Sequence, residues 1–191
     1  MKRIAVVFPG IGYTLDKPLL YYGRKLLKKS GYEEIKLLDY TGLGSVSIKG
    51  NADKMAKAFD VIYSKTEEYL KDIHWEEYDE ILFLSKSIGT ITASAYAEKF
   101  GLNSKDIRHV LYTPLEYTFA FHPKCAVAFT GSADSWCIPS DIIKLAEEQN
   151  IPINVYENAD HSLETGDILH DIDTLRDVME KTADFIRGTD Q

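Results

Sequence analysis

The chain has 191 residues with 45% hydrophobic content, which suits a single domain spanning residues 1–191 with one continuous core. Its formal net charge of −8 argues against nucleic acid or an anionic membrane surface as a partner. The apolar run at residues 4–8 is shorter than a signal-peptide core, and no run approaches the roughly 20 residues of a membrane helix, so we expect a cytoplasmic protein.

Short apolar runs alternate with longer segments of helical spacing along the chain. The predicted strands cover residues 4–8, 35–38, 81–84, 109–112, 126–129 and 153–156, and the predicted helices cover 18–29, 52–71, 90–100, 140–149 and 171–186. Strands that are apolar throughout are typical of parallel strands buried on both faces. The alternation predicts a three-layer α/β sandwich, a six-stranded, mostly parallel sheet with helices on both faces. In such sheets, sites gather at the carboxyl ends of the strands.

The loop after the first strand, residues 9–12 with the sequence PGIG, has two interpretations. As a phosphate-binding loop it lacks the third glycine of G-x-G-x-x-G, because Leu15 stands there, although Asp39 could act as the ribose-binding acid. As an oxyanion loop it would offer the Ile11 backbone N–H to the end of a neighbouring strand. We prefer the second interpretation, which shares a site with Ser87 and requires no cofactor.

The segment SKSIG, residues 85–89, joins the third strand directly to the next helix. A nucleophile on a sharp strand-to-helix turn has a strained backbone and needs small residues two positions before and after it. Ser87 has Ser85 and Gly89 at those positions, whereas a phenylalanine precedes Ser85 at the same spacing. We therefore predict Ser87 as a nucleophile and the Ile88 amide, at the helix N-terminus, as an oxyanion donor. A serine-rich turn without chemistry is the alternative.

One of the five histidines directly follows a strand at the predicted active edge. This residue is His161, and beside a serine on a strained turn it is a candidate general base. The others fit less well, since His74 and His109 precede strands at the opposite edge, His122 lies in a loop, and His170 begins the last helix.

The acid that would orient this histidine has three candidates. Asp134 is the first carboxylate after the fifth strand and is our choice. Asp160 is the reserve, because it adjoins His161 in sequence and neighbours in an extended loop point apart. Glu164 is a further competitor. An ordinary loop aspartate that bonds its own backbone is the alternative for Asp134.

The order of serine, aspartate and histidine at successive strand ends resembles the α/β-hydrolase family. The resemblance covers nearly the whole chain and is carried by residues 9–12, 85–89, 131–134 and 159–163. It implies a compact α/β-hydrolase fold that lacks the family's two leading strands and its helical cap, with strand order 2-1-3-4-5-6. Two features depart from the family pattern: Ser85 replaces the first glycine of the nucleophile turn, and the oxyanion loop has no histidine.

The predicted activity is that of a serine hydrolase that cleaves a small-molecule carboxylic ester, or a thioester, through an acyl-enzyme. An aromatic segment, residues 112–121, begins at the same sheet edge. We expect the substrate pocket to be walled by Tyr13, Glu116, Tyr117 and Trp136. Lys86 and Glu116 could select a charged group, although a solvated charge is the expectation for each. The alternative is a hydrolase-like protein that binds a small molecule without turnover.

Overall fold

The computed structural model describes residues 1–40 and 51–188, and its centre is one six-stranded sheet. The strands are β1 (Arg3–Phe8), β2 (Glu34–Leu37), β3 (Glu80–Lys86), β4 (Ile107–Tyr112), β5 (Ala126–Gly131) and β6 (Ile153–Tyr156). All neighbours pair in parallel, in the order β2-β1-β3-β4-β5-β6. The predicted fold class and strand order are therefore confirmed.

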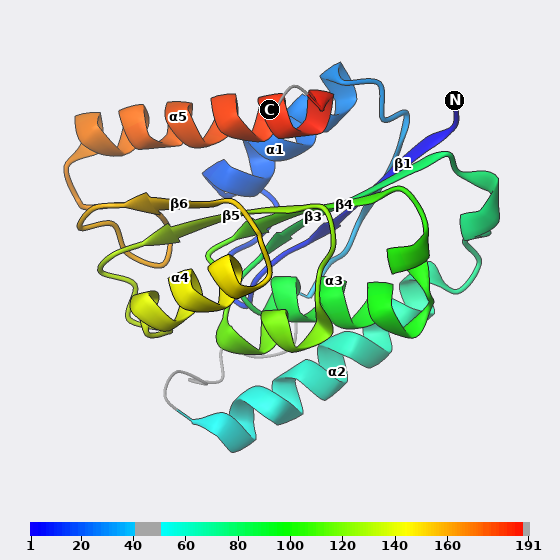
Figure 1. Cartoon of the computed structure of the whole chain (residues 1–191), viewed down its shortest axis with the longest axis horizontal. Coiled ribbons are helices and arrows are strands. Elements are labelled where there is room, and N and C mark those ends of the chain that lie inside the picture. The colour runs from blue at the N-terminus through cyan, green and yellow to red at the C-terminus, as the bar shows by residue number, and fades with distance from the viewer. Residues whose placement is uncertain (41–50, 189–191) are drawn as a thin grey trace.

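Helices cover both faces of the sheet, as Figure 1 shows. The helices α1 (Pro18–Lys29) and α5 (Ile168–Arg187) lie on one face, and α2 (Ala52–Leu70), α3 (Ile88–Lys99) and α4 (Pro139–Glu148) lie on the other. Three short 3-10 helices complete the described structure: η1 (Trp75–Glu77), η2 (Leu102–Ser104) and η3 (Glu116–Phe121). None of the helices in the described ranges is long and apolar enough to cross a membrane.

The central strand β3 divides the core into two layers because successive side chains point to opposite faces. Ile81 and Phe83 pack under α2 and α3, while Leu82 and Leu84 pack under α1 and α5. From Ile81 to Lys86 every residue of β3 is buried. This burial on both faces explains why the strand is apolar without alternation, as the sequence pattern indicated.

Several boundaries differ from the predicted ones. β3 continues two residues beyond Leu84, to Lys86, because its backbone keeps pairing with β4 up to Tyr112. α5 begins three residues earlier than predicted, at Ile168, where Asp167 caps the first turn by accepting hydrogen bonds from two backbone N–H groups. The placement of His109 before the fourth strand was wrong, since it lies within β4 and is fully buried.

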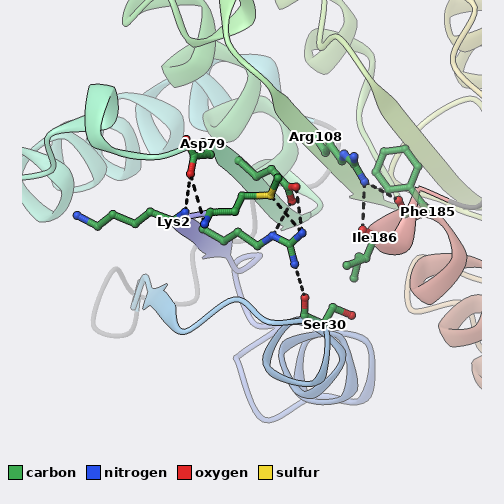
Figure 2. A network of polar contacts seen from close by, with 9 residues as sticks. Lys2, Ser30, Asp79, Arg108, Phe185 and Ile186 are labelled. Atoms are coloured by element: carbon green, nitrogen blue, oxygen red, sulfur yellow. Dashed lines mark hydrogen bonds and ion pairs between the residues drawn. The ribbon is translucent and has the colours of Figure 1, made fainter.

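The amino ends of the strands are held by polar contacts, shown in Figure 2. The Lys2 backbone N–H donates to Asp79 (2.6 Å). Arg3 donates to the carbonyl of Ser30 (3.0 Å), just beyond α1. Arg108 donates to the carbonyls of Phe185 and Ile186 (3.3 and 3.1 Å) in the last turn of α5. Guanidinium groups thus satisfy carbonyls at the C-terminal ends of both helices on this face, where cations are favourable.

Candidate active site

Ser87 lies at the sharp turn between β3 and α3, with no intervening loop. Its backbone has φ 57° and ψ −129°, an unfavourable conformation for a residue with a side chain. The turn is held by the Ser87 N–H, which donates to the carbonyl of Tyr112 (3.0 Å), and by the Ser87 carbonyl, which accepts from the backbone N–H and the hydroxyl of Thr90 (2.8 and 2.6 Å). The strained turn thus places the Ser87 hydroxyl at the carboxyl edge of the sheet, between the end of β3 and the start of α3.

The residues beside this turn are small because other backbone segments approach it. A Cβ on Gly89 would lie 2.5 Å from the carbonyl oxygens of Phe8 and Pro9, so only glycine fits there. Ser85 replaces the usual glycine on the other side, and its hydroxyl donates to the carbonyl of Val110 (3.0 Å). The substitution is accommodated because the added hydroxyl, although buried, has a hydrogen-bond partner.

A continuous chain of hydrogen bonds joins Ser87, His161 and Asp134. The Ser87 Oγ lies 2.8 Å from His161 Nε2, and His161 Nδ1 lies 2.7 Å from Asp134 Oδ2. A carboxylate only accepts hydrogen bonds, so Nδ1 carries the proton and donates to Asp134. Nε2 is then the acceptor for the Ser87 hydroxyl. The three predicted residues, from three different strand ends, are therefore brought into direct contact.

Close packing of two loops brings the acid to the histidine. Gly131 ends β5, and a Cβ at this position would lie 2.1 Å from the carbonyl oxygen of Ala159. The Ala133 N–H also donates to that carbonyl (3.0 Å). Asp134 and His161 follow these contact points by one and two residues. The absence of a side chain at Gly131 thus lets the loop after β5 approach the loop that carries the histidine.

Burial and hydrogen bonding set the charges of the acid and the base. The Asp134 side chain is fully buried, and burial alone would raise its pKa. The hydrogen bond from His161 and the N–H of Trp136 (2.9 Å to Oδ1) outweigh burial and hold the pKa of Asp134 below its ordinary value. Burial also lowers the pKa of His161 below its ordinary value of 6.5, against the opposing hydrogen bond to Asp134. Near neutral pH the site contains a carboxylate and a neutral imidazole.

Among the described residues, neither of the two competing acids forms a hydrogen bond with His161. Asp160 Oδ1 accepts from the backbone N–H groups of Ser162 (2.6 Å) and Glu164 (3.2 Å), so it shapes the histidine loop rather than bonding the imidazole. Glu164 is exposed. Asp39, proposed as a ribose-binding acid in the dinucleotide interpretation, is also exposed.

The predicted oxyanion donors are the backbone amides of Ile11 and Ile88, which lie close to Ser87 along the chain or in space. Ile88 is the first residue of α3, and Ile11 follows Gly10, whose Cβ position lies 3.2 Å from the Ser87 Cβ. Among the residues that the structure describes, neither the Ile11 N–H nor the Ile88 N–H donates a hydrogen bond within the protein. Both amides therefore stay candidates for donating hydrogen bonds to a ligand.

The predicted pocket residues occupy different environments. Trp136 is half-buried and stacks on the His161 imidazole, with ring centroids 5.3 Å apart and an interplanar angle of 23°. Tyr117 is exposed on η3, and Glu116 accepts a hydrogen bond from the Ile138 N–H (3.1 Å), which ties η3 to the start of α4. Tyr13 is only 8% exposed and packs in the core. Of the four, Trp136 is thus the one in direct contact with the histidine.

The expectation of a solvated charge at Lys86 was wrong. Its side chain is 1% exposed, and its Nζ lies 4.8 Å from the centroid of the Tyr13 ring. Alternation along β3 explains this placement, because Lys86 points to the same face as Leu82 and Leu84. The signal was available in the sequence once β3 is extended to residue 86. Burial lowers the pKa of Lys86 to about 7.

The order of the six parallel strands, the strained turn at Ser87 and the loops at the carboxyl ends of the strands together define the α/β-hydrolase fold. No family model and no curated protein matches the chain. Its structure is similar to that of an α/β serine hydrolase homologue from Coxiella burnetii (16% identity, 95% of this chain and 83% of that chain, TM-score 0.61). It is also similar to the Pyrococcus furiosus esterase Pf2001 (14%, 97% and 82%, TM-score 0.64). A third similar structure is a serine hydrolase without a lid from Xanthomonas campestris (15%, 97% and 81%, TM-score 0.64).

Proposed function

We propose that this protein is a serine hydrolase that cleaves a small carboxylic ester, or a thioester, through an acyl-enzyme. The observation that carries the proposal is the hydrogen-bond chain from Ser87 through His161 to Asp134. The structural likeness to serine hydrolases and an esterase supports the same class of reaction.

In the first half of the reaction, His161 Nε2 takes the proton of the Ser87 hydroxyl while its oxygen attacks the carbonyl carbon. Asp134 fixes the imidazole tautomer and stabilises the imidazolium that forms. The negative charge on the carbonyl oxygen is bound by the N–H groups of Ile88 and Ile11, each worth roughly 3–4 kcal/mol in comparable sites. The imidazolium then protonates the leaving alcohol or thiol, and the acyl group remains on Ser87.

In the second half, water enters in place of the alcohol. His161 now takes a proton from this water, whose oxygen attacks the acyl carbon, and the same two amides bind the oxyanion. The acid product leaves as the proton returns to Ser87. Every proton transfer in this scheme uses a protein group or water.

Ester hydrolysis tests the proposal. We expect p-nitrophenyl esters to be hydrolysed, with a fast first turnover if deacylation is slow, and Ser87→Ala to abolish this activity. Ser64→Ala, on the exposed face of α2, is the matched control and should leave the activity unchanged. Activity on a series of p-nitrophenyl esters with acyl chains of increasing length would measure the size of the acyl pocket. Equal activity in the Ser87→Ala protein would refute the proposal, and specific binding of an ester without turnover would point to a binding protein.

A further inference from the structure

The loop between β1 and α1 is anchored at its start by backbone packing against the serine turn. A Cβ on Gly89 would lie 2.5 Å from the carbonyl oxygens of Phe8 and Pro9, so the two backbone segments are in contact. Gly10 is also close to the nucleophile, because a Cβ at Gly10 would lie 3.2 Å from the Ser87 Cβ. The start of the loop therefore has a fixed path past the turn.

Tyr13 anchors the other end of the loop through three contacts. Its carbonyl accepts a hydrogen bond from the Gly10 N–H (3.2 Å), which ties together the ends of the segment 10–13. Its hydroxyl accepts a hydrogen bond from the Leu19 N–H (3.1 Å) in the first turn of α1. Its ring centroid lies 4.8 Å from the Nζ of Lys86, the last residue of β3. Tyr13 thus joins the loop to a helix and to the strand that precedes the nucleophile.

The contact with Leu19 takes the place of a helix cap. The first N–H groups of a helix have no partner within the helix. Lys17, the N-cap residue of α1, makes no side-chain hydrogen bond to them, and Pro18 has no N–H. The Tyr13 hydroxyl therefore satisfies the first available N–H of α1. Because Tyr13 and Leu19 are both buried in the same apolar cluster, water does not compete for this hydrogen bond.

The residues between the two anchors need an outside restraint. Glycines flank Ile11 on both sides, and Gly12 has φ 75°, so the segment itself has wide conformational freedom. Among the described residues, the backbone N–H groups of Ile11 and Gly12 form no hydrogen bond within the protein. The path of this segment is therefore set by the serine turn on one side and by Tyr13 on the other.

We propose that Tyr13 is a positioning residue that holds this loop, so that the Ile11 N–H keeps one place relative to Ser87. Donors to an oxyanion are effective because they are already oriented when the charge develops. A loop released at Tyr13 would have to order Ile11 again in each turnover. The catalytic part of this inference rests on the proposed function, whereas the ordering of the loop is a property of the fold alone.

The experiment measures NMR order parameters of the Ile11 and Gly12 backbone amides. In Tyr13→Leu, which keeps an apolar side chain without the ring and the hydroxyl, we expect them to fall from about 0.85 toward about 0.6, the range of mobile backbone. Tyr13→Phe removes the hydrogen bond to Leu19 alone and should lower them by a smaller amount. Tyr32→Leu is the matched control and should leave them unchanged, because Tyr32 is a buried tyrosine of the same apolar cluster that precedes β2, at the amino edge of the sheet.

Kinetics test the catalytic part. In an active enzyme, Tyr13→Leu should lower kcat by about 10- to 100-fold while KM stays within about twofold, because an oxyanion donor acts in the transition state and a small misplacement suffices. Tyr32→Leu should leave both constants unchanged. A loop that becomes mobile in Tyr13→Leu without loss of kcat would overturn the positioning role.

The outcomes separate this inference from the proposed function. Order parameters that stay unchanged in the folded Tyr13→Leu and Tyr13→Phe proteins would overturn the role of Tyr13, whether or not the protein hydrolyses esters. Equal falls in Tyr13→Leu and Tyr32→Leu would also overturn it, since any buried tyrosine would then have the same effect. A fall confined to the Tyr13 variants, in a protein without ester hydrolysis, would support the anchoring of the loop and refute the hydrolase.

Discussion

Replacing His109 with leucine should stabilise the protein, and more so in acid. His109 lies in β4 with a fully buried side chain, and its ring packs edge-on against Phe83 (5.6 Å, 85°). Neither ring nitrogen has a hydrogen-bond partner among the described residues. An unsatisfied buried polar group costs roughly 1–3 kcal/mol, and leucine fills a similar volume without that cost. We expect His109→Leu to raise the free energy of unfolding by about 1–3 kcal/mol at pH 7.5.

The effect should grow as the pH falls. Burial lowers the pKa of His109 to about 3, whereas in the unfolded chain it has its ordinary value of 6.5. Between these values the unfolded state binds a proton that the folded state does not, so the wild type loses stability as the pH falls from 6.5 toward 3. At about 1.4 kcal/mol per pH unit, the gap between His109→Leu and the wild type should widen by roughly 2 kcal/mol between pH 7.5 and pH 5.

Urea unfolding at several pH values measures this gap directly. His74→Leu is the control, because the His74 side chain is 72% exposed, so this variant replaces a histidine with leucine outside the core. Parallel pH curves for His109→Leu and the wild type, or a variant less stable than the wild type at pH 7.5, would show that the buried imidazole is not a liability and refute the reasoning.

Three further predictions concern the site. Asp134→Asn should lower kcat by about 10⁴-fold. Asp160→Asn should retain most of the activity, because its amide oxygen can still accept hydrogen bonds from the loop N–H groups. Equal losses of activity in the two variants would contradict the choice of Asp134 as the acid. The kcat/KM should rise with pH through a His161 pKa below 6.5, since the neutral imidazole is the base, and a limb centred above pH 7 would argue against it. Gly89→Ala should cost about 1–3 kcal/mol in a thermal melt, because its Cβ would meet two carbonyl oxygens at 2.5 Å; an unchanged melting temperature would count against the tight turn.

The sheet, and the meeting of Ser87, His161 and Asp134 at one edge of it, could be predicted from the sequence because both depend on where the strands end. Once parallel strands were inferred from unbroken apolar runs, Ser87 and His161 had to lie at the same edge. The two small neighbours of the serine then marked the turn. The small residues around Ser87 and the order of the strands both indicated a site at this sheet edge. A short motif was therefore enough to predict the nucleophile.

The features that the sequence analysis missed depend on side-chain burial. Lysine is mostly exposed in proteins, so Lys86 was expected in solvent, and His109 was placed before a strand and hence at the opposite sheet edge; both side chains are buried. Tyr13 was expected at the pocket wall, and its buried ring lies 4.8 Å from the Lys86 ammonium. The stacking of Trp136 on His161 likewise depends on the path of a loop after β5 that no periodic pattern specifies.

Labelling with a fluorophosphonate probe, followed by peptide mass spectrometry, tests the central claim most directly. The probe reacts with a serine whose proton is taken by a neighbouring base, so the wild type should carry one adduct on Ser87 and the His161→Ala protein should label far more slowly. A folded wild type that remains unlabelled, or an adduct on another serine that persists in Ser87→Ala, would contradict the claim.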